Sequence, residues 1–339
     1  MNNITLSHGS GGDATSKLIE EVFRNEFHNE YLDRMEDSSV VPGGKRLALT
    51  TDSFVVQPLI YDGGDIGRLS VCGTVNDILM SGAEPKYLTA GFVLEEGLDT
   101  GLLKRIVHSM AETAEEAGVR IVAGDTKVIE HKGGKDDNPG LIINTAGVGF
   151  LNEKVNVGAS LIKEGDAVIL SGNIGDHHAA IMKERLSIRN EKIKSDNAPL
   201  NEMVRRLFDN GIEVHALRDV TRGGLGTVLN EFSKESGQDI FIIEEKLPVS
   251  DAVRDFSALL GLDILYMGNE GKMVCTVAAK DKDKAVDIIR RSKYGEEAEI
   301  IGYAESPVTA GEGKLILKTG IGGERIVGPL YGEGLPRIC

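Results

Sequence analysis

Cysteine is scarce in this sequence, and the few residues present exclude a disulfide framework. The 339-residue chain contains only Cys72, Cys275 and Cys339. An odd and sparse set cannot supply the paired cysteines of a disulfide scaffold. The patterns C-x-x-C and H-E-x-x-H are also missing, so we do not expect a zinc site. Cys72 and Cys275 lie in apolar surroundings and are predicted to be core residues, whereas Cys339 could be either incidental or reactive.

Long apolar segments and an excess of basic residues are also lacking. No apolar run approaches the ~18 residues that cross a membrane, and residues 1–10 do not resemble a signal peptide. We therefore expect a cytoplasmic protein without membrane contact. The 38 Lys and Arg residues are outnumbered by 53 Asp and Glu residues, which gives a net charge of −15. This charge argues against a nucleic-acid partner but allows a nucleotide ligand, because a metal ion can supply positive charge locally.

Glycine, in contrast, is abundant, and it has no G-X-Y period. The 42 glycines are therefore expected in turns and ligand loops rather than in a collagen-like helix. Two glycine-rich segments precede predicted helices, HGSGG at 8–12 and TRGGLG at 221–226. A glycine loop that enters a helix presents free N–H groups to anions. Neither segment matches a Walker loop or a dinucleotide fingerprint, so by spacing alone ordinary turns are the default interpretation.

Hydrophobic periodicity predicts a mixture of strands and helices in both halves of the chain. The predicted strands are 46–51, 87–94, 119–124, 141–150, 166–171, 239–244, 273–278, 298–304 and 314–319. The predicted helices are 15–27, 65–81, 99–117, 177–186, 198–210, 223–236, 249–260 and 281–292. The expected fold class is α/β (α+β), with two mixed domains at 1–155 and 156–327 and a flexible tail at 328–339.

Five acidic residues lie at the ends of predicted strands or beside small residues. They are Asp52, Asp77, Asp125, Asp219 and Glu270. Strand ends and the adjacent loops are where α/β proteins place ligand groups, and carboxylates are ligands that Mg²⁺ prefers. The alternative is that each residue caps a helix or fixes a turn.

The adjacent histidines at 177 and 178 and the C-terminal tail each allow a structural or a functional interpretation. His177 and His178 are adjacent, so on a helix they point about 100° apart and cannot chelate one metal in the i, i+4 manner. A tail from Gly328 to Cys339 could reach roughly 40 Å when extended. Its thiol could therefore enter an active site, or it could simply lie at a frayed end.

Several motifs in a fixed order resemble one known family. They are LSHGSGG near the start, TTDSFVV at 50–56, VCGTVNDILMSGA at 71–83, VAGDTKV at 122–128, SGNIGDHHAAI at 171–181, LRDVTRGGL at 217–225, GNEGKM at 268–273 and PRIC at 336–339. Together they resemble the HypE family of hydrogenase maturation carbamoyl dehydratases over essentially the whole chain. The segments before PRIC also resemble the wider group of aminoimidazole ribonucleotide synthase, selenophosphate synthetase and thiamine-monophosphate kinase.

The resemblance implies an enzyme that uses ATP and Mg²⁺. A partner carbamoyltransferase would load a carboxamide onto Cys339, and ATP-dependent dehydration would convert it to a thiocyanate. The cyano group would pass to an iron-carrying maturation complex as a ligand of the [NiFe] hydrogenase centre. The N-terminal domain would bind ATP and form a homodimer, and the tail would move between an inward and an outward state.

The resemblance also implies roles for individual residues. The implied catalytic residues are Cys339, Glu270 as the base for the amide nitrogen, Lys127 as a stabiliser of negative charge on oxygen, and His177 or His178 in assistance. The implied ATP-binding residues are Ser10, Gly11, Gly12, Asp52, Asn76, Asp125, Thr126, Arg222 and Gly223. The implied Mg²⁺ ligands are Asp52, Asp77, Asp125 and Asp219.

Two other functions remain open at this stage. One is a small-molecule ATP enzyme of the same group, similar to selenophosphate synthetase or a phosphate kinase. The glycine loop at 8–12 carries no reactive cysteine, unlike that of most selenophosphate synthetases. The other is a non-catalytic scaffold that binds partners through its tail and does not turn over ATP.

Overall fold

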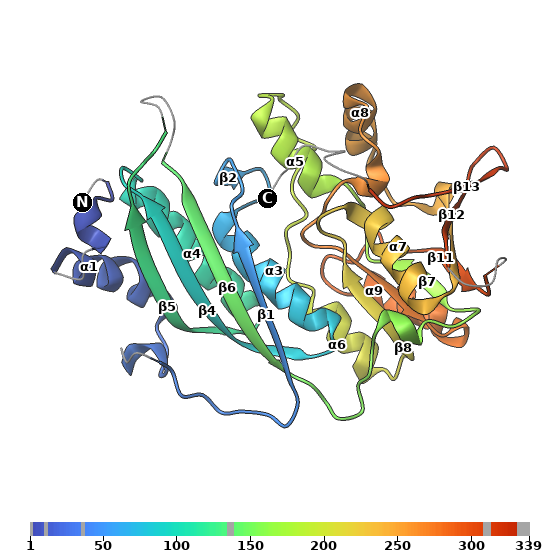
Figure 1. Cartoon of the computed structure of the whole chain (residues 1–339), viewed down its shortest axis with the longest axis horizontal. Helices are drawn as coiled ribbons and strands as arrows, with labels where there is room; N and C mark the ends of the chain where they lie inside the picture. Colours follow the sequence, from blue (N-terminus) through green and yellow to red (C-terminus); the bar gives the residue numbers. More distant parts are fainter. Residues whose placement is uncertain (1–2, 10–12, 35–37, 134–138, 308–312, 331–339) are drawn as a thin grey trace.

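The structure is a computed structural model, and it describes residues 3–9, 13–34, 38–133, 139–307 and 313–330. The predicted loop residues Ser10, Gly11 and Gly12 lie outside the described residues, as does Cys339. The described chain forms two halves that lie side by side (Figure 1). None of its helices has the length and apolarity needed to cross a membrane.

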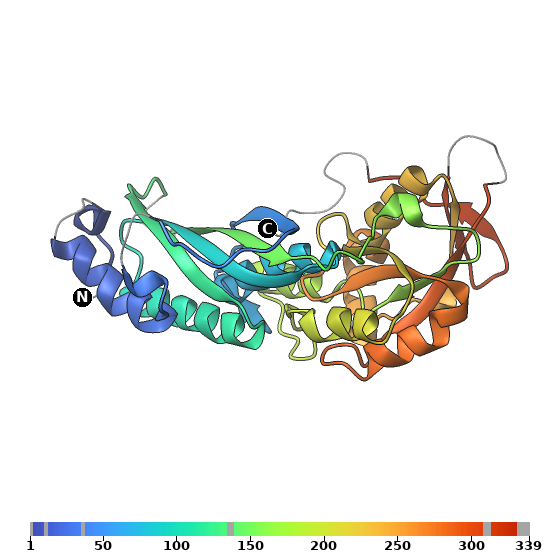
Figure 2. The same cartoon turned by 90° about the horizontal axis from the view of Figure 1, so that it is seen from below.

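The described part of the first half contains a four-stranded sheet in the order β1–β6–β4–β5. Its strands are β1 (Leu47–Phe54), β6 (Leu141–Phe150), β4 (Glu84–Glu95) and β5 (Arg120–Ile129). Helices α3 (Ile66–Met80) and α4 (Thr100–Glu116) lie on the same side of this sheet as the N-terminal helical segment (Figure 2). The sheet is therefore covered on one face.

Local sequence explains where α4 begins and ends. The side chain of Asp99 accepts a hydrogen bond from the backbone N–H of Leu102 at 2.8 Å and so caps the first turn. Leu103, Ile106 and Met110 share one face and are fully buried. Gly118, with φ of +66°, follows the last turn. The predicted helix at 99–117 is confirmed.

Two predicted strands end too early. β1 continues through Asp52 to Phe54, and β5 continues through Asp125 to Ile129. The sequence suggested that residues 52 and 125 lie at strand ends, and this prediction is wrong because both lie within strands. The polar residues do not interrupt the strands because neighbouring strands supply the ladder: Asp52 is opposite Thr145, and Asp125 is opposite Gly91.

The predicted N-terminal helix contains a wider turn in the middle. It comprises α1 (Asp13–Leu18), a π-helical segment (Ile19–Arg24) and α2 (Asn25–Phe27). The π-helical turn adds a residue to the ordinary helical repeat, and both Val22 and Phe23 are buried. This segment packs against the outer part of the four-stranded sheet (Figure 2).

The described second half is built on a seven-stranded sheet in the order β13–β12–β9–β11–β7–β10–β8. These strands are β13 (Glu324–Ile326), β12 (Leu315–Lys318), β9 (Asp239–Ile243), β11 (Glu299–Glu305), β7 (Ala167–Leu170), β10 (Met273–Val277) and β8 (Val214–Asp219). The shortest elements form a hairpin in the first half, β2 (Ile60–Tyr61) with β3 (Gly64–Asp65). The predicted α/β class is confirmed.

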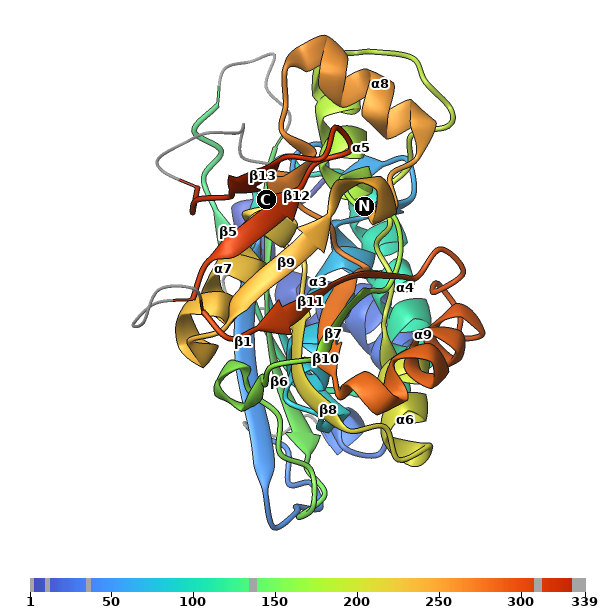
Figure 3. The same cartoon turned by 90° about the vertical axis from the view of Figure 1, so that its right-hand side faces the viewer.

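Helices cover both faces of this second sheet (Figure 3). The remaining helices are α5 (Asp176–Arg185), α6 (Asn201–Asp209), α7 (Gly224–Ser236), α8 (Asp251–Leu260) and α9 (Lys282–Arg290). Val168 and Leu170 of β7 belong to the same buried cluster as the apolar face of α7. Ile169, which points to the opposite face, belongs to the cluster that contains α6 and α9.

The two halves are joined by one continuous core and by charged contacts. The larger buried cluster includes side chains of α3 and α4 and also of α6 and α9. The ammonium group of Lys183, which is buried, pairs with Asp62 of the first half. Glu116 accepts a hydrogen bond from Arg68 at 2.9 Å and also bonds Lys293 and Tyr294 of the second half.

Glu116→Gln should destabilise this junction in a pH-dependent way. Partial burial opposes ionisation of Glu116, but hydrogen bonds from Lys293, Tyr294 and Arg68 outweigh it and lower its pKa from 4.5 to about 2. Because the folded-state pKa lies below the unfolded one, the stabilisation is full above pH 4.5 and lost as pH falls toward 2. We expect a loss of about 1–2 kcal/mol near neutral pH, since solvent screens part of the interaction.

Urea denaturation across this pH range measures the difference. Glu112→Gln is the matched control, because its carboxylate lies on the same helix but is mostly exposed. An equal loss of stability at pH 7 and pH 2 would show that Glu116 acts through packing and not through charge.

Candidate active site

Three aspartates from different elements meet where the two halves join. Asp52 lies on β1, Asp77 on α3 and Asp219 at the end of β8, and α3 contacts both strands. Burial, together with repulsion from Asp77 and Asp52, raises the pKa of Asp219 to about 7 against the attraction of Arg218. The three carboxylates therefore form one electrostatically coupled group.

Short contacts fix the first two carboxylates. The hydroxyl of Thr50 donates to Oδ2 of Asp77 at 2.8 Å, and the backbone N–H of Ser53 donates to Oδ1 of Asp52 at 2.7 Å. Burial, followed by repulsion from Asp52, raises the pKa of Asp77 although the Thr50 hydrogen bond opposes this. A Cβ on Gly73 would lie 2.8 Å from the Phe54 ring, so glycine allows α3 to approach β1 closely.

Glu270 is the fourth acidic member of this group. It lies before β10 and is 8% exposed. Burial raises its pKa well above the usual value, and repulsion from Asp219, Asp196 and Asp52 adds to the effect, whereas Arg222 opposes it. A buried carboxylate with high proton affinity is suited to accept a proton from a substrate.

Arg222 and Gly223 approach the same group from the start of α7. The positive charge of Arg222 opposes the rise in the pKa values of both Asp77 and Glu270. Gly223 and Gly224 have φ of +77° and +62°, a conformation that favours glycine. This turn brings the N-terminus of a 13-residue helix to the acidic group, where its N–H groups favour an anionic ligand.

The donor set fits Mg²⁺ bound together with phosphates. Among the described residues, no group of three or more His, Cys, Asp or Glu side chains is arranged to hold a metal ion by itself. Mg²⁺ usually keeps several waters and binds one or two carboxylates plus substrate phosphates, so a closed site is not required. A divalent cation would also relieve the repulsion that raises the pKa values of Asp77 and Asp219.

Asp125 and Lys127 lie elsewhere in the described chain. Across the four-stranded sheet, Asp125 is aligned with Gly91, Asn144 and Ser53, and their side-chain positions lie on the open face of the sheet. Asp52 is one residue before Ser53 on β1, so its side chain lies on the opposite, covered face. Its carboxylate accepts a hydrogen bond from Lys127 at 2.9 Å, which lowers its pKa, and both side chains are about two-thirds exposed. Within one chain, the described structure does not bring them to the acidic group.

Comparisons with known proteins agree over the whole chain. The sequence matches the family models for the AIR synthase related protein, N-terminal domain, at residues 35–151 and C-terminal domain at 163–311. It is 45% identical over 99% of this chain and 95% of the relative to the carbamoyl dehydratase HypE of Cupriavidus necator. The chain belongs to the carbamoyl dehydratase HypE family.

Solved structures of the same family match the fold. The crystal structure of hydrogenase maturation protein HypE in complex with ATP has a TM-score of 0.93 at 40% identity and covers 99% of both chains. A HypE–HypF complex matches with a TM-score of 0.78 at 47% identity, over 92% of this chain and 99% of that one. The HypE fold thus includes both halves described above.

His177 and His178 are both buried. Burial lowers the pKa of each to about 4, so both rings are neutral near pH 7. The Nδ1 atom of His177 lies 2.8 Å from the hydroxyl of Ser195, and its ring meets that of Tyr61 edge to face. The backbone N–H of His178 donates to the carbonyl oxygen of Gly268, so the two histidines lie next to the segment that carries Glu270.

The structure also places Asn76, Thr126 and the two cysteines that were predicted to lie in the core. Asn76 is 2% exposed and forms hydrogen bonds with backbone groups of the second half. Thr126 lies on the covered face of β5. Cys72 and Cys275 are fully buried, and burial raises the pKa of Cys275 to about 12. The prediction of two core thiols is confirmed.

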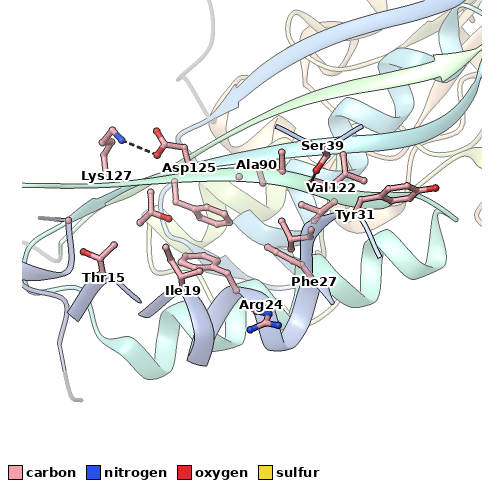
Figure 4. Close-up of a pocket in the computed structure, with 18 residues that line it drawn as sticks. Thr15, Ile19, Arg24, Phe27, Tyr31, Ser39, Ala90, Val122, Asp125 and Lys127 are labelled. Atoms are coloured by element: carbon pink, nitrogen blue, oxygen red, sulfur yellow. Dashed lines mark hydrogen bonds and ion pairs between the residues drawn. The ribbon is translucent and has the colours of Figure 1, made fainter. Parts of the chain in front are cut away.

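A cavity that the sequence did not indicate lies beside β5. It has a volume of about 370 Å³ and is enclosed between the N-terminal helical segment and strands β4 and β5. Ile19 and Phe27 lie on the helical side, whereas Asp125 and Lys127 lie on the other side of β5 (Figure 4). Its lining combines apolar side chains such as Phe23 and Phe92 with polar ones such as Thr15 and Arg24. The packing of the π-helical segment against the sheet brings these residues together.

Proposed function

We propose that this chain catalyses the ATP-dependent dehydration of an S-carboxamide on Cys339 to a thiocyanate. The observation that carries the proposal is a buried carboxylate of high proton affinity, Glu270, beside three coupled aspartates at the junction of the two halves. Family membership and the ATP complex of a 40%-identical structure support ATP as the second substrate.

The chemistry requires a phosphate leaving group and a base. The carboxamide oxygen takes the γ-phosphoryl group as its bond to ADP breaks, which converts a poor leaving group into a good one. Glu270 accepts one proton from the amide nitrogen as the phosphorylated imidate forms and passes it to solvent. It accepts the second proton as the C–O bond breaks with release of phosphate. Sulfur remains bonded to carbon, so the product is a thiocyanate on the same thiol. A dry site favours the elimination, which agrees with the burial of Glu270.

Asp52, Asp77 and Asp219 would hold Mg²⁺, with Asp125 as a further ligand from a second copy of the chain. When bound, the ion neutralises charge on the phosphates. The residues Arg222 and Gly223 would bind phosphate oxygens through the guanidinium group and the start of α7. Ser10, Gly11 and Gly12 would cover the phosphates, and this assignment rests on the sequence resemblance.

A homodimer would bring the separated residues together. The open face of the four-stranded sheet exposes Leu49, which is 72% exposed, together with Leu47 and Ile142. Asp125 and Lys127 lie on this same face. Pairing two such faces would bury the apolar side chains and direct the exposed Asp125–Lys127 pair toward the neighbouring copy. We propose that each active site includes Asp125 and Lys127 of the partner subunit.

Leu49→Asp should therefore produce a monomer that is inactive but folded. A carboxylate at the centre of the open face would be desolvated on dimerisation, which disfavours the dimer. Light scattering after gel filtration measures the mass, and circular dichroism checks the fold. Leu259→Asp is the control, since Leu259 is 76% exposed on α8 and far from this sheet. A dimeric Leu49→Asp protein with full activity would contradict the interface.

The proposed partners follow from the reaction. A solved complex pairs HypE with HypF, and we propose the corresponding carbamoyltransferase as the protein that loads Cys339. An iron-carrying maturation complex would accept the cyano group. Residues 1–155 would bind ATP and form the dimer, 156–327 would supply Asp219 and Glu270, and 328–339 would move Cys339 between sites. The expected compartment is the cytoplasm.

Intact mass spectrometry tests the reaction directly. After incubation with the carbamoyltransferase and then with Mg-ATP, wild-type protein should gain a carboxamide and then lose one water. Cys339→Ala should show neither change because it lacks the acceptor thiol. A thiocyanate on the Cys339→Ala variant would refute the proposal. Equal ATPase rates for loaded and unloaded protein without a mass change would instead favour a small-molecule enzyme, and no ATP turnover would favour a scaffold.

A further inference from the structure

The backbone that carries Glu270 is held from one side by a buried aspartate. Oδ1 of Asp196 accepts the N–H of Glu270 at 3.0 Å, and Oδ2 accepts the N–H of Gly271 at 3.4 Å. The Asp196 side chain is 2% exposed and lies 3.5 Å from the ammonium group of Lys272. One carboxylate thus binds two consecutive N–H groups, an arrangement that fixes the direction of the peptide between them.

Close backbone packing restricts this segment further. A Cβ on Gly271 would lie 1.9 Å from the carbonyl oxygen of Asp196 and 2.8 Å from the nitrogen of Ala198. Such distances exclude a side chain without backbone movement, so residues 196–198 and 270–271 pack directly against each other. The Glu270 segment therefore has little freedom to move away from Asp196.

The opposite side is held by Asn76 of α3. Its Nδ2 atom donates to the carbonyl oxygens of Ala198 at 3.0 Å and of Glu270 at 3.3 Å. Its Oδ1 atom accepts the N–H of Leu200 at 3.0 Å. The side-chain amide is buried and committed to three backbone groups from the second half of the chain, which leaves it poorly placed to bind a nucleotide.

The position of Asn76 gives these contacts a functional meaning. Asp77, the next residue on α3, belongs to the acidic group. A single turn of α3 therefore carries one proposed Mg²⁺ ligand and also the amide that binds the backbone of the proposed base. The two halves of the chain meet at this point, so their relative placement determines how far Glu270 lies from Asp77.

We propose that Asn76 and Asp196 are positioning residues, forming a clamp across the domain junction that holds Glu270 at a fixed place relative to the carboxylate of Asp77. The proposal rests on the proposed function in taking Glu270 as the base. It assigns Asn76 a role other than the ATP contact that the sequence resemblance implied. Neither residue touches the reacting atoms, and both act through the backbone of Glu270.

Single-turnover kinetics on the carbamoylated full-length protein at varied ATP concentrations separate the two roles of Asn76, with kcat as the rate constant at saturating ATP and KM as the ATP concentration that gives half of it. Asn76→Ala and Asp196→Asn should lower kcat for thiocyanate formation about 10²-fold, since a displacement near 1 Å has effects of this size. The KM for ATP should change less than about threefold, because nucleotide contacts remain. Asp166→Asn is the matched control: Asp166 is a buried aspartate that bonds His215 at 2.6 Å, remote from Glu270. It should lower Tm but leave kcat unchanged.

The outcomes are distinguishable. A large rise in the KM for ATP with unchanged kcat in Asn76→Ala would make Asn76 a nucleotide ligand and overturn the clamp. Wild-type kcat in Asp196→Asn would also overturn it. A fall in kcat for Asp166→Asn equal to that of the two variants would show that general destabilisation explains the effect, against the proposal. If Glu270→Gln keeps full activity, the base assignment fails and the clamp fails with it. If wild-type protein forms no thiocyanate, the proposed function itself fails.

Discussion

Glu270→Gln is expected to reduce the rate of thiocyanate formation by about 10²–10⁴-fold, the range typical for loss of a general base. The amide occupies nearly the same volume as the carboxylate but cannot accept the proton from the amide nitrogen. Binding of ATP should persist, because the aspartates and Arg222 are unchanged. The loss should therefore appear in kcat, with little change in the KM for ATP.

Two measurements test this expectation. Rapid-quench mass spectrometry on carbamoylated protein gives the single-turnover rate of water loss, and calorimetry gives the affinity for Mg-ATP. Glu299→Gln is the control, because that carboxylate pairs with Arg290 at 2.9 Å on β11, outside the acidic group. If Glu270→Gln loses ATP binding instead of turnover, Glu270 acts as a ligand and the base lies elsewhere.

Patterns that depend on local chemistry were predictable from the sequence. The helix at α4 follows from its Asp99 cap and apolar face, and the burial of Cys72 and Cys275 follows from apolar neighbours. The meeting of Asp52, Asp77 and Asp219 was indicated only by motif resemblance, because they are distant in sequence. Their proximity depends on the packing of α3 between β1 and β8.

Other features depend on tertiary packing and gave no local signal. Asp52 and Asp125 were expected at strand ends, but ladder partners extend both strands past them. Asp196 carried no motif, yet it binds the backbone of Glu270. A carboxylate that accepts two consecutive N–H groups from a distant segment is not recognisable until the chain is folded. Sequence spacing also could not show that Asp125 and Asp52 belong to opposite faces of one sheet.

The second large effect is expected on thiocyanate formation when Asp52 or Lys127, which lie on opposite faces of one sheet, is replaced. Asp52→Asn and Lys127→Ala should each abolish nearly all thiocyanate formation, because one weakens the Mg²⁺ site and the other removes the positive charge proposed to stabilise the carboxamide oxygen. If the two residues reach one site from different subunits, a mixed dimer has one intact site and one doubly altered site. Equal mixing and reassociation should then restore about a quarter of wild-type activity, because half of the dimers are mixed and one of the two sites in each mixed dimer is intact.

Complementation distinguishes this arrangement from a site within one chain. If both residues acted in the same chain, no mixed dimer would contain an intact site, and activity would stay at the level of the single variants. Native mass spectrometry of differently tagged subunits confirms that mixed dimers form. Lys104→Ala is the control for Lys127→Ala, since Lys104 is half-exposed on α4, away from the open face; it should remain active alone. Mixed dimers without regained activity would place Lys127 outside the partner's site, whatever its effect as a single variant.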